Sequence, residues 1–243
     1  MSDAAIVMEN VSFRYGDTEV LKEISFQGKE GESIGLVGAN GAGKSTFLKL
    51  LVGLLPDYQG NIQVCGIRVE KQNLSRIRAK TGYVFQDSES QLFLSTVYDD
   101  VAFAPRNYGY SKEEVDRRVQ EALKRIHITH LQNKAIYRMS GGEKKLASIA
   151  TILSMTPDII LLDEPSIALD PKNRRNLIHV LNELPQLKLI ASHDLDMILD
   201  TCSRTILIGN GRIMADGDTQ SILTDKALLE ENGLELPLCL QRK

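Results

Sequence analysis

One short stretch, residues 38–46 with the sequence GANGAGKST, constrains this chain more than any other. It fits the pattern G-x-x-x-x-G-K-[ST] through Gly38, Gly43, Lys44 and Ser45. That pattern is meaningful only where a strand leads into it and a helix follows it. The flanking residues therefore decide whether it is a phosphate loop or an ordinary glycine-rich turn.

Both flanks fit a phosphate loop. Residues 33–37 form an apolar run typical of a buried strand, and apolar residues recur at helical spacing over 47–55. Glycines let the backbone turn its N–H groups inward, and the following helix adds the positive end of its dipole. We expect the loop to hold a polyphosphate, with Lys44 at the β- and γ-phosphates and the Ser45 hydroxyl on Mg²⁺. The residues expected to line it are Gly38, Ala39, Asn40, Gly41, Ala42, Gly43, Lys44, Ser45 and Thr46.

Composition excludes several classes of protein. Lys and Arg number 29 and Asp and Glu 32, so the net charge of −3 gives no footprint for nucleic acid. Cys65, Cys202 and Cys239 have no C-x-x-C spacing, so we expect neither disulfides nor zinc, and a reducing cytoplasm. No apolar run approaches the ~20 residues of a membrane span, and no signal peptide is apparent. We expect the protein to be soluble by itself.

Two residues at the ends of predicted strands each have two possible interpretations. Residues 6–15 and 20–27 fit an antiparallel hairpin, with Tyr15 at its turn. Tyr15 either stacks on a base or is a half-exposed turn residue. Gln86 follows a predicted strand at 81–85, and it either reaches a bound cation and a water or is a surface amide.

Ser140 and Glu143 form a predicted capping box at the start of a helix. The two residues between them, Gly141 and Gly142, are not explained by capping, because glycine in a helix interior costs ~0.8–1.0 kcal/mol relative to alanine. Glycines at a helix start expose N–H groups to an anion. We therefore expect this helix start to bind one.

A buried strand predicted at 159–162 ends in Asp163 and Glu164. Adjacent carboxylates there are costly without a cation. We expect Asp163 to hold Mg²⁺ and Glu164 to orient or deprotonate a water, the alternative being a solvent-exposed pair. Asp170 has a simpler interpretation as a helix N-cap, because Pro171 follows it at the first helical position.

His193 stands at the end of another predicted strand, at 187–191. A single histidine is usually structural. In a parallel sheet, however, this strand would end at the same crevice as the others.

The ordered set resembles the nucleotide-binding subunit of ATP-binding cassette transporters over essentially the whole chain. The resemblance identifies residues 38–46 as Walker A, Gln86 as the Q-loop, 140–143 as the signature, 159–164 as Walker B, 168–170 as the D-loop with Asp170, His193 as the switch histidine, and Tyr15 as the adenine-stacking aromatic. The chain departs from the usual signature at Glu143, where Gln is common, and at Met139, where Leu is common. The serine and second glycine are kept.

This resemblance implies a head-to-tail homodimer or heterodimer that sandwiches two ATP molecules, with Walker A of one subunit facing the signature of the other. It also implies Mg²⁺ held by Ser45, Gln86 and Asp163. Glu164 would polarise the attacking water, and His193 would contact the γ-phosphate.

A narrower resemblance covers residues 84–109 and 233–238, which are similar to the ATPases of energy-coupling-factor importers, particularly the cobalt type. It implies a transmembrane coupling protein, a substrate-binding membrane subunit and a place at the cytoplasmic face of the cell membrane. The segment after Gln86 would form a groove for the coupling protein's helices. Its apolar members either line that groove or are helical core: Leu92, Phe93, Val97, Val101 and Phe103. Cobalt, nickel and a vitamin all remain open as the cargo.

We predict a single α/β domain with a phosphate-loop NTPase core of RecA-like parallel sheet, an N-terminal antiparallel β layer and an inserted helical subdomain. The core takes residues 1–86 and 156–224, the subdomain 87–155 and a tail 225–243. The predicted function is ATP hydrolysis driving import. A soluble non-transport cassette ATPase is one alternative, although no coiled-coil or zinc insertion fits here, and a different transporter class is another.

Overall fold

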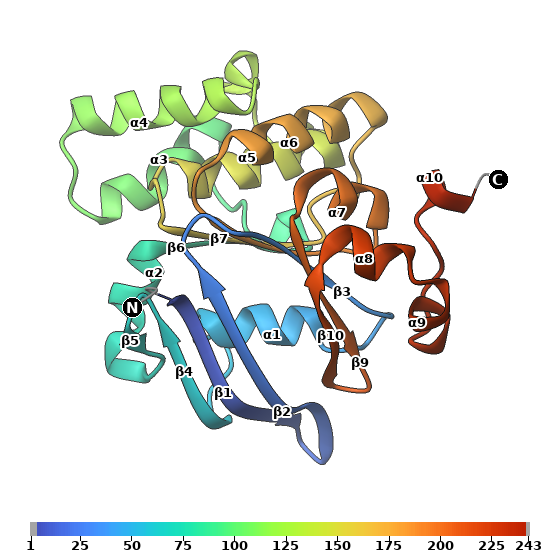
Figure 1. The fold of residues 1–243 in the computed structure, drawn as a ribbon. Coiled ribbons are helices and arrows are strands. Elements are labelled where there is room, and N and C mark those ends of the chain that lie inside the picture. The colour runs from blue at the N-terminus through green and yellow to red at the C-terminus, as the bar shows by residue number, and fades with distance from the viewer. Residues whose placement is uncertain (1–3, 242–243) are drawn as a thin grey trace.

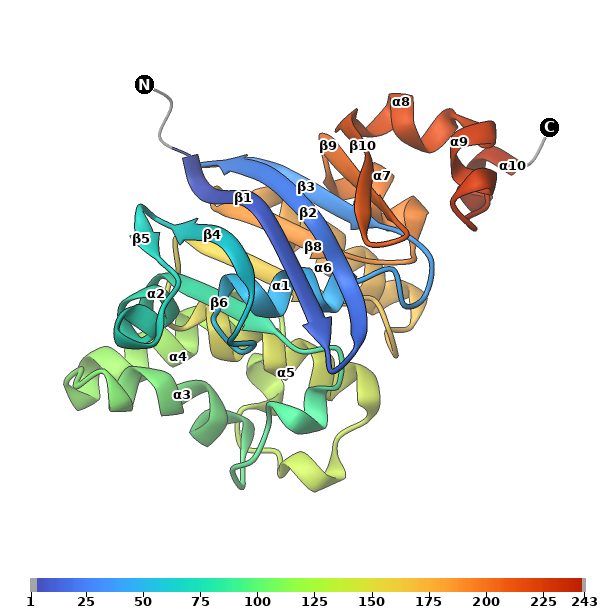
Figure 2. The same cartoon turned by 90° about the horizontal axis from the view of Figure 1, so that it is seen from below.

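The computed structural model describes residues 4–241, which form two sheets and the helices around them (Figures 1 and 2). The strands are β1 (Ala4–Tyr15), β2 (Thr18–Lys29), β3 (Ser33–Val37), β4 (Gln59–Val64), β5 (Ile67–Arg68), β6 (Thr81–Val84), β7 (Ile159–Asp163), β8 (Leu187–Ala191), β9 (Arg204–Gly209) and β10 (Arg212–Asp218). The helices are α1 (Lys44–Leu51), α2 (Leu74–Lys80), α3 (Val97–Asn107), α4 (Lys112–Arg125), α5 (Gly141–Leu153), α6 (Pro171–Glu183), α7 (Leu195–Thr201), α8 (Thr219–Thr224), α9 (Lys226–Glu231) and α10 (Leu238–Gln241).

The larger sheet has the strand order β10-β9-β3-β8-β7-β6. Its pairs are parallel except at the β10 edge, where the turn at Asn210 and Gly211 returns the chain as an antiparallel hairpin. The smaller sheet, β2-β1-β4-β5, is antiparallel and contains the predicted N-terminal hairpin. The predicted fold class is therefore confirmed.

Side-chain alternation along the buried strands creates a core on each face of the larger sheet. On β7, Ile159 and Leu161 pack with α1 and the smaller sheet, whereas Ile160 and Leu162 pack with the helices on the other side. Helix α1 lies between the two sheets, and α3 to α6 cover the opposite face (Figure 1). Helices α8 to α10 lie on the side of the molecule away from α3 and α4 (Figure 2). The boundaries proposed for a helical subdomain, 87–155, stay a prediction.

Local signals were right at some helix ends and wrong at others. The predicted helix over 47–55 ends at Leu51, because Gly53 takes a left-handed φ of 61° where the side chain of Leu74 packs against it. Ser111 caps α4 by accepting from the N–H of Glu114, whose carboxylate pairs with arginines on the same helix. Within residues 4–241, no helix has the length and apolar character needed to cross a bilayer.

Candidate nucleotide-binding site

The carboxyl ends of four parallel strands bring the predicted residues to one edge of the larger sheet. Leu36 on β3 and Asp163 on β7 both pair with Ala191 on β8, and Val84 on β6 pairs with Leu162. The residues that follow these strands begin the phosphate loop and supply Glu164, His193 and Gln86. Ligands of open α/β sheets bind in the crevice at this edge.

The phosphate loop is built around a buried lysine. The Nζ atom of Lys44 donates to the carbonyls of Gly38 at 2.7 Å and Ala39 at 3.2 Å. Burial lowers the pKa of Lys44, and the charges of Glu164 and Asp163 oppose that shift. A cation held only by backbone carbonyls inside the loop is ready to exchange them for phosphate oxygens.

Glycine is required at both ends of the loop. A Cβ on Gly38 would lie 2.3 Å from the carbonyl oxygen of Ile208, which is backbone and cannot yield. Gly43 precedes α1 with a φ of 107°, in a region that L side chains rarely adopt. Together they direct the loop onto the first turn of α1, whose N–H groups have no intrahelical partners.

A hydroxyl and a carboxylate meet beside this loop in a way that fits Mg²⁺. The Ser45 hydroxyl donates to Oδ1 of the buried Asp163 at 2.9 Å, and the Tyr83 hydroxyl donates to Oδ2 at 3.2 Å. Among residues 4–241, no group of three His, Cys, Asp or Glu side chains is arranged so that it could hold a metal ion. Mg²⁺ needs no such cluster, because it takes one or two carboxylates, phosphate oxygens and waters. Gln86 has an exposed side chain just past the neighbouring strand.

Glu164 is bound to the end of β8 through both its backbone and its side chain. Its N–H donates to the carbonyl of Ala191 at 2.8 Å, and its Oε2 lies 2.7 Å from Nδ1 of His193 and accepts from the His193 N–H at 3.3 Å. Its φ is 50°, a left-handed conformation that is uncommon for a residue other than glycine. Strained backbone of this kind concentrates at functional sites. Buried, strained and joined to a histidine, Glu164 does not fit the alternative of a solvent-exposed carboxylate.

Residues 21–167 match the family model described as ABC transporter. The chain belongs to the ATP-binding cassette transporter family. It is 46% identical to a putative ABC transporter ATP-binding protein of Geobacter sulfurreducens, over 99% of this chain and 97% of that protein. It is 41% identical to the energy-coupling factor transporter ATP-binding protein EcfA of Carboxydothermus hydrogenoformans, over 98% of this chain and 89% of that protein.

Two solved structures are similar over most of their length. CbiO1 from Clostridium perfringens, described as part of the ABC transporter complex cbiONQ, has a TM-score of 0.83 and 33% identity, covering 94% of each chain. A dimeric ATP-binding cassette in a post-hydrolysis state with ADP and Pi has a TM-score of 0.80 and 27% identity, covering 88% of this chain and 98% of that one. This cassette is accordingly an ATP-binding subunit of an ABC transporter, and it hydrolyses ATP.

The residues predicted to form the signature, 140–143, are a separate cluster at the start of α5. Ser140 and Glu143 complete a reciprocal capping box, at 3.3 Å and 2.8 Å, and Lys134 pairs with Glu143 at 2.7 Å. A Cβ on Gly142 would lie 3.0 Å from the carbonyl oxygen of Ala168 in the D-loop. Packing therefore explains Gly142, while Gly141 lies exposed at the helix start.

Two further predicted residues lie outside this hydrogen-bonded group. Tyr15 is 47% exposed at the tip of the first hairpin, where its ring meets Phe13 edge-on at 4.9 Å. Asp170 caps α6 by accepting from the N–H of Asn173 at 2.8 Å, as the simpler interpretation required.

Sequence reasoning missed Tyr83 and Lys145, which contact Asp163 and Gln86, and Gln91, which links Phe85 beside Gln86 to α5. Tyr83 and Lys145 reach site residues that are distant in sequence, and Gln91 reaches a distant helix. An alternation pattern marks Tyr83 only as a strand residue, and a lysine in a helix ordinarily indicates a solvated face. No local signal distinguishes them.

Proposed function

We propose that this cassette is the ATPase subunit of an energy-coupling-factor importer, in which two cassettes sandwich Mg·ATP beneath a membrane coupling protein. The resemblance to EcfA and to CbiO1 supports this class of transporter. The single observation that carries the membrane partner is an apolar groove beside Gln86.

ATP binding is assigned first. Lys44 and the N–H groups at the start of α1 bind the β- and γ-phosphates, and the exposed ring of Tyr15 supports the adenine. Ser45, Asp163 and Gln86 would hold Mg²⁺, which when bound neutralises charge on the phosphate oxygens.

Hydrolysis is assigned to the pair Glu164 and His193. Glu164 orients a water against the γ-phosphorus and takes up its proton, because its carboxylate is held rigidly at the strand end. Nδ1 of His193 is occupied by Glu164, so Nε2 is the ring nitrogen left to contact the γ-phosphate.

We infer a dimer because the two helix starts proposed to bind anions, those of α1 and α5, form separate clusters within one subunit. Walker A and the signature cluster at Ser140 each offer N–H groups, and a head-to-tail pair would place one of each around a γ-phosphate. Hydrolysis then removes the charge that joins the subunits. The dimeric state of the post-hydrolysis cassette supports this arrangement.

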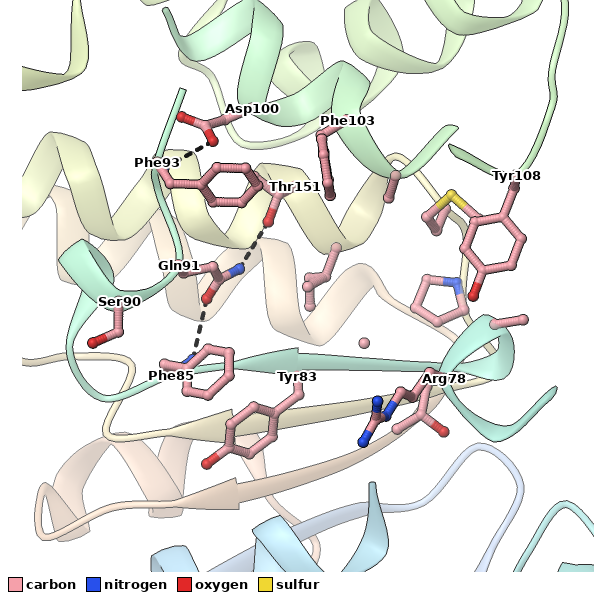
Figure 3. Close-up of a pocket in the computed structure, with 17 residues that line it drawn as sticks. Arg78, Tyr83, Phe85, Ser90, Gln91, Phe93, Asp100, Phe103, Tyr108 and Thr151 are labelled. Carbon is pink, nitrogen blue, oxygen red and sulfur yellow. Dashed lines mark hydrogen bonds between the residues drawn. The ribbon is translucent and has the colours of Figure 1, made fainter. Parts of the chain in front are cut away.

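The groove is a cavity of about 320 Å³ between β6, the loop after it, α3 and α5 (Figure 3). Phe93 and Phe103, 62% and 40% exposed, meet edge-to-face at 4.9 Å on its wall, and Tyr108 stands at its far end. Buried Asp100 accepts from the N–H of Phe93 at 3.1 Å and so fixes the wall.

The apolar residues of this segment divide between the two alternatives. Leu92, Val97 and Val101 are buried core, whereas Phe93 and Phe103 face the groove. Exposed aromatic rings on the wall of a concave surface are typical of a protein contact. Its occupant is proposed to be a helix of the coupling protein.

We propose cobalt ions, nickel ions or a vitamin as the cargo, because residues 84–109 and 233–238 resemble the cobalt-type ATPases of energy-coupling-factor importers. The cargo need not touch this subunit, so no residue here selects it. A different ABC transporter class would use the same cassette with other membrane partners.

Co-purification from membranes tests the proposal. The tagged cassette should retain an integral coupling subunit, and Phe103→Glu should lose it while Met214→Glu, an equally exposed apolar position on β10, retains it. ATP hydrolysis by the isolated cassette should persist in both variants. Recovery of the cassette with no integral protein, or undiminished capture by Phe103→Glu, would contradict the groove assignment.

A further inference from the structure

Helix α5 carries a lysine that is almost completely buried. Lys145 is 2% exposed, and its Nζ donates to the carbonyls of Gln86 at 2.7 Å and Phe85 at 3.0 Å. These two carbonyls belong to the turn that leaves β6 and presents the Gln86 side chain. Lys145, in the second turn of α5, therefore holds the backbone around Gln86 by hydrogen bonds.

A second side chain fastens the same turn to the same helix. Gln91 accepts from the N–H of Phe85 at 3.2 Å and donates to the hydroxyl of Thr151 at 2.7 Å (Figure 3). It also donates to the carbonyl of Ser148 at 2.7 Å. Phe85 is thus held at its carbonyl by Lys145 of α5, and at its N–H by Gln91, which is itself bonded to α5. The Q-loop backbone and the signature helix form one hydrogen-bonded unit.

Stability alone does not account for the lysine. Burial is the largest influence on Lys145 and lowers its pKa, while Asp163, Asp87 and Glu164 oppose that shift. A buried charge carries a desolvation cost that an apolar side chain of similar volume would avoid. What an apolar residue cannot supply is the pair of N–H donors to Phe85 and Gln86.

We propose that Lys145 is a positioning residue that acts through Gln86, holding its backbone so that the amide stays at the edge of the sheet shared with Asp163. The side chain of Gln86 is exposed, so little packing holds it in place. The position from which it extends is set by the backbone that Lys145 holds. This inference rests on the proposed role of Gln86 in ATP hydrolysis. It assigns no contact between Lys145 and ATP.

Two near-isosteric variants separate the donors from the volume. Lys145→Met removes both donors, and kcat for ATP hydrolysis should fall about 10- to 100-fold, the scale of a misplaced catalytic group. Lys145→Gln keeps an N–H₂ donor and should restore most of that loss. ATP affinity by equilibrium titration should stay at the wild-type value in both, because Lys44 and its loop are not altered. Equal loss in the two variants would overturn the proposal.

Hydrogen exchange gives a readout that does not depend on activity. In Lys145→Met, amides of residues 86–91 should exchange faster, while the amides of β7 and β8 keep their wild-type rates. Unchanged exchange over 86–91 would show that Lys145 does not hold this turn.

A double-mutant cycle with Gln86→Ala decides whether Lys145 acts through Gln86. If it does, Lys145→Met should lower kcat in the wild-type background and cause no further loss in Gln86→Ala. The same fold-loss in both backgrounds would overturn the inference while leaving the proposed role of Gln86 intact. Wild-type kcat in Gln86→Ala alone would instead remove the assumed role of Gln86, and the inference with it.

Discussion

Replacing Glu164 by Gln separates ATP binding from ATP hydrolysis in this cassette. The amide has the same shape, and its oxygen can still accept from Nδ1 of His193, which lies 2.7 Å from Oε2 in the native chain. It cannot take a proton from water. Loss of a general base costs about 10²- to 10⁴-fold in rate, which is about 3–5 kcal/mol in the activation free energy. Binding should be kept, because Lys44 and Ser45 contact other groups.

The assay has two parts. Steady-state phosphate release gives kcat, and light scattering with saturating Mg·ATP gives the mass in solution, where the variant should accumulate as a nucleotide-bound dimer. Glu121→Gln, on the exposed face of α4, is the matched control and should behave as the wild type. Wild-type turnover in Glu164→Gln would remove this residue from the mechanism. A variant that stays monomeric while binding ATP would refute the sandwich.

Three further variants test the rest of the site. Lys44→Ala should weaken ATP itself in equilibrium titration, and an unchanged dissociation constant would refute the phosphate-loop assignment. Gly38→Ala places a Cβ 2.3 Å from a backbone oxygen, so the free energy of unfolding should fall by about 1–3 kcal/mol. The control Gly217→Ala, whose Cβ would have its nearest atom at 3.8 Å, should keep the wild-type denaturant midpoint. Equal midpoints in the two variants would contradict this. Tyr83→Phe removes the hydroxyl that donates to Asp163, and the Mg²⁺ concentration for half-maximal ATPase activity should rise about 10-fold or more, as for other groups that orient metal ligands. An unchanged Mg²⁺ midpoint would show that Tyr83 does not orient Asp163.

Short-range signals in the sequence predicted the elements of this fold well. The strand at 159–162 was visible as an apolar run ending in Asp163 and Glu164, and the caps at Ser140 and Asp170 follow from side chains three residues from their partners. The order of the strands in the larger sheet was not predicted, since a parallel sheet joins residues far apart in sequence.

The side-chain contacts that hold Asp163 and Gln86 in place were not predictable from short-range signals. Tyr83 reaches Asp163 across 80 positions, and Lys145 reaches Gln86 across 59. The dependence on a distant partner also applies to Gly141 and Gly142, which from sequence predicted only an anion site. In the structure Gly142 also gives room to the carbonyl of Ala168, a residue in the left-handed region with a φ of 68°. Steric demands from a distant loop leave no trace in local composition.

The site is assembled from two groups of side chains that are each joined internally. Glu164 and His193 are tied to one another at the ends of β7 and β8, whereas Gln86 is tied through its backbone to α5. Backbone pairing joins the groups between β6 and β7 only as far as Val84 and Leu162. The side chain of Tyr83, one residue before Val84, reaches past that pair to bond Asp163 on β7, and it also lies on the floor of the groove (Figure 3). A partner bound in the groove would therefore contact the side chain that bonds the proposed Mg²⁺ ligand.

Tyr83→Phe should abolish stimulation of ATPase activity by the membrane partner while leaving the partner bound, if the contact from the groove through Tyr83 to Asp163 carries the signal. Undiminished stimulation would exclude this route.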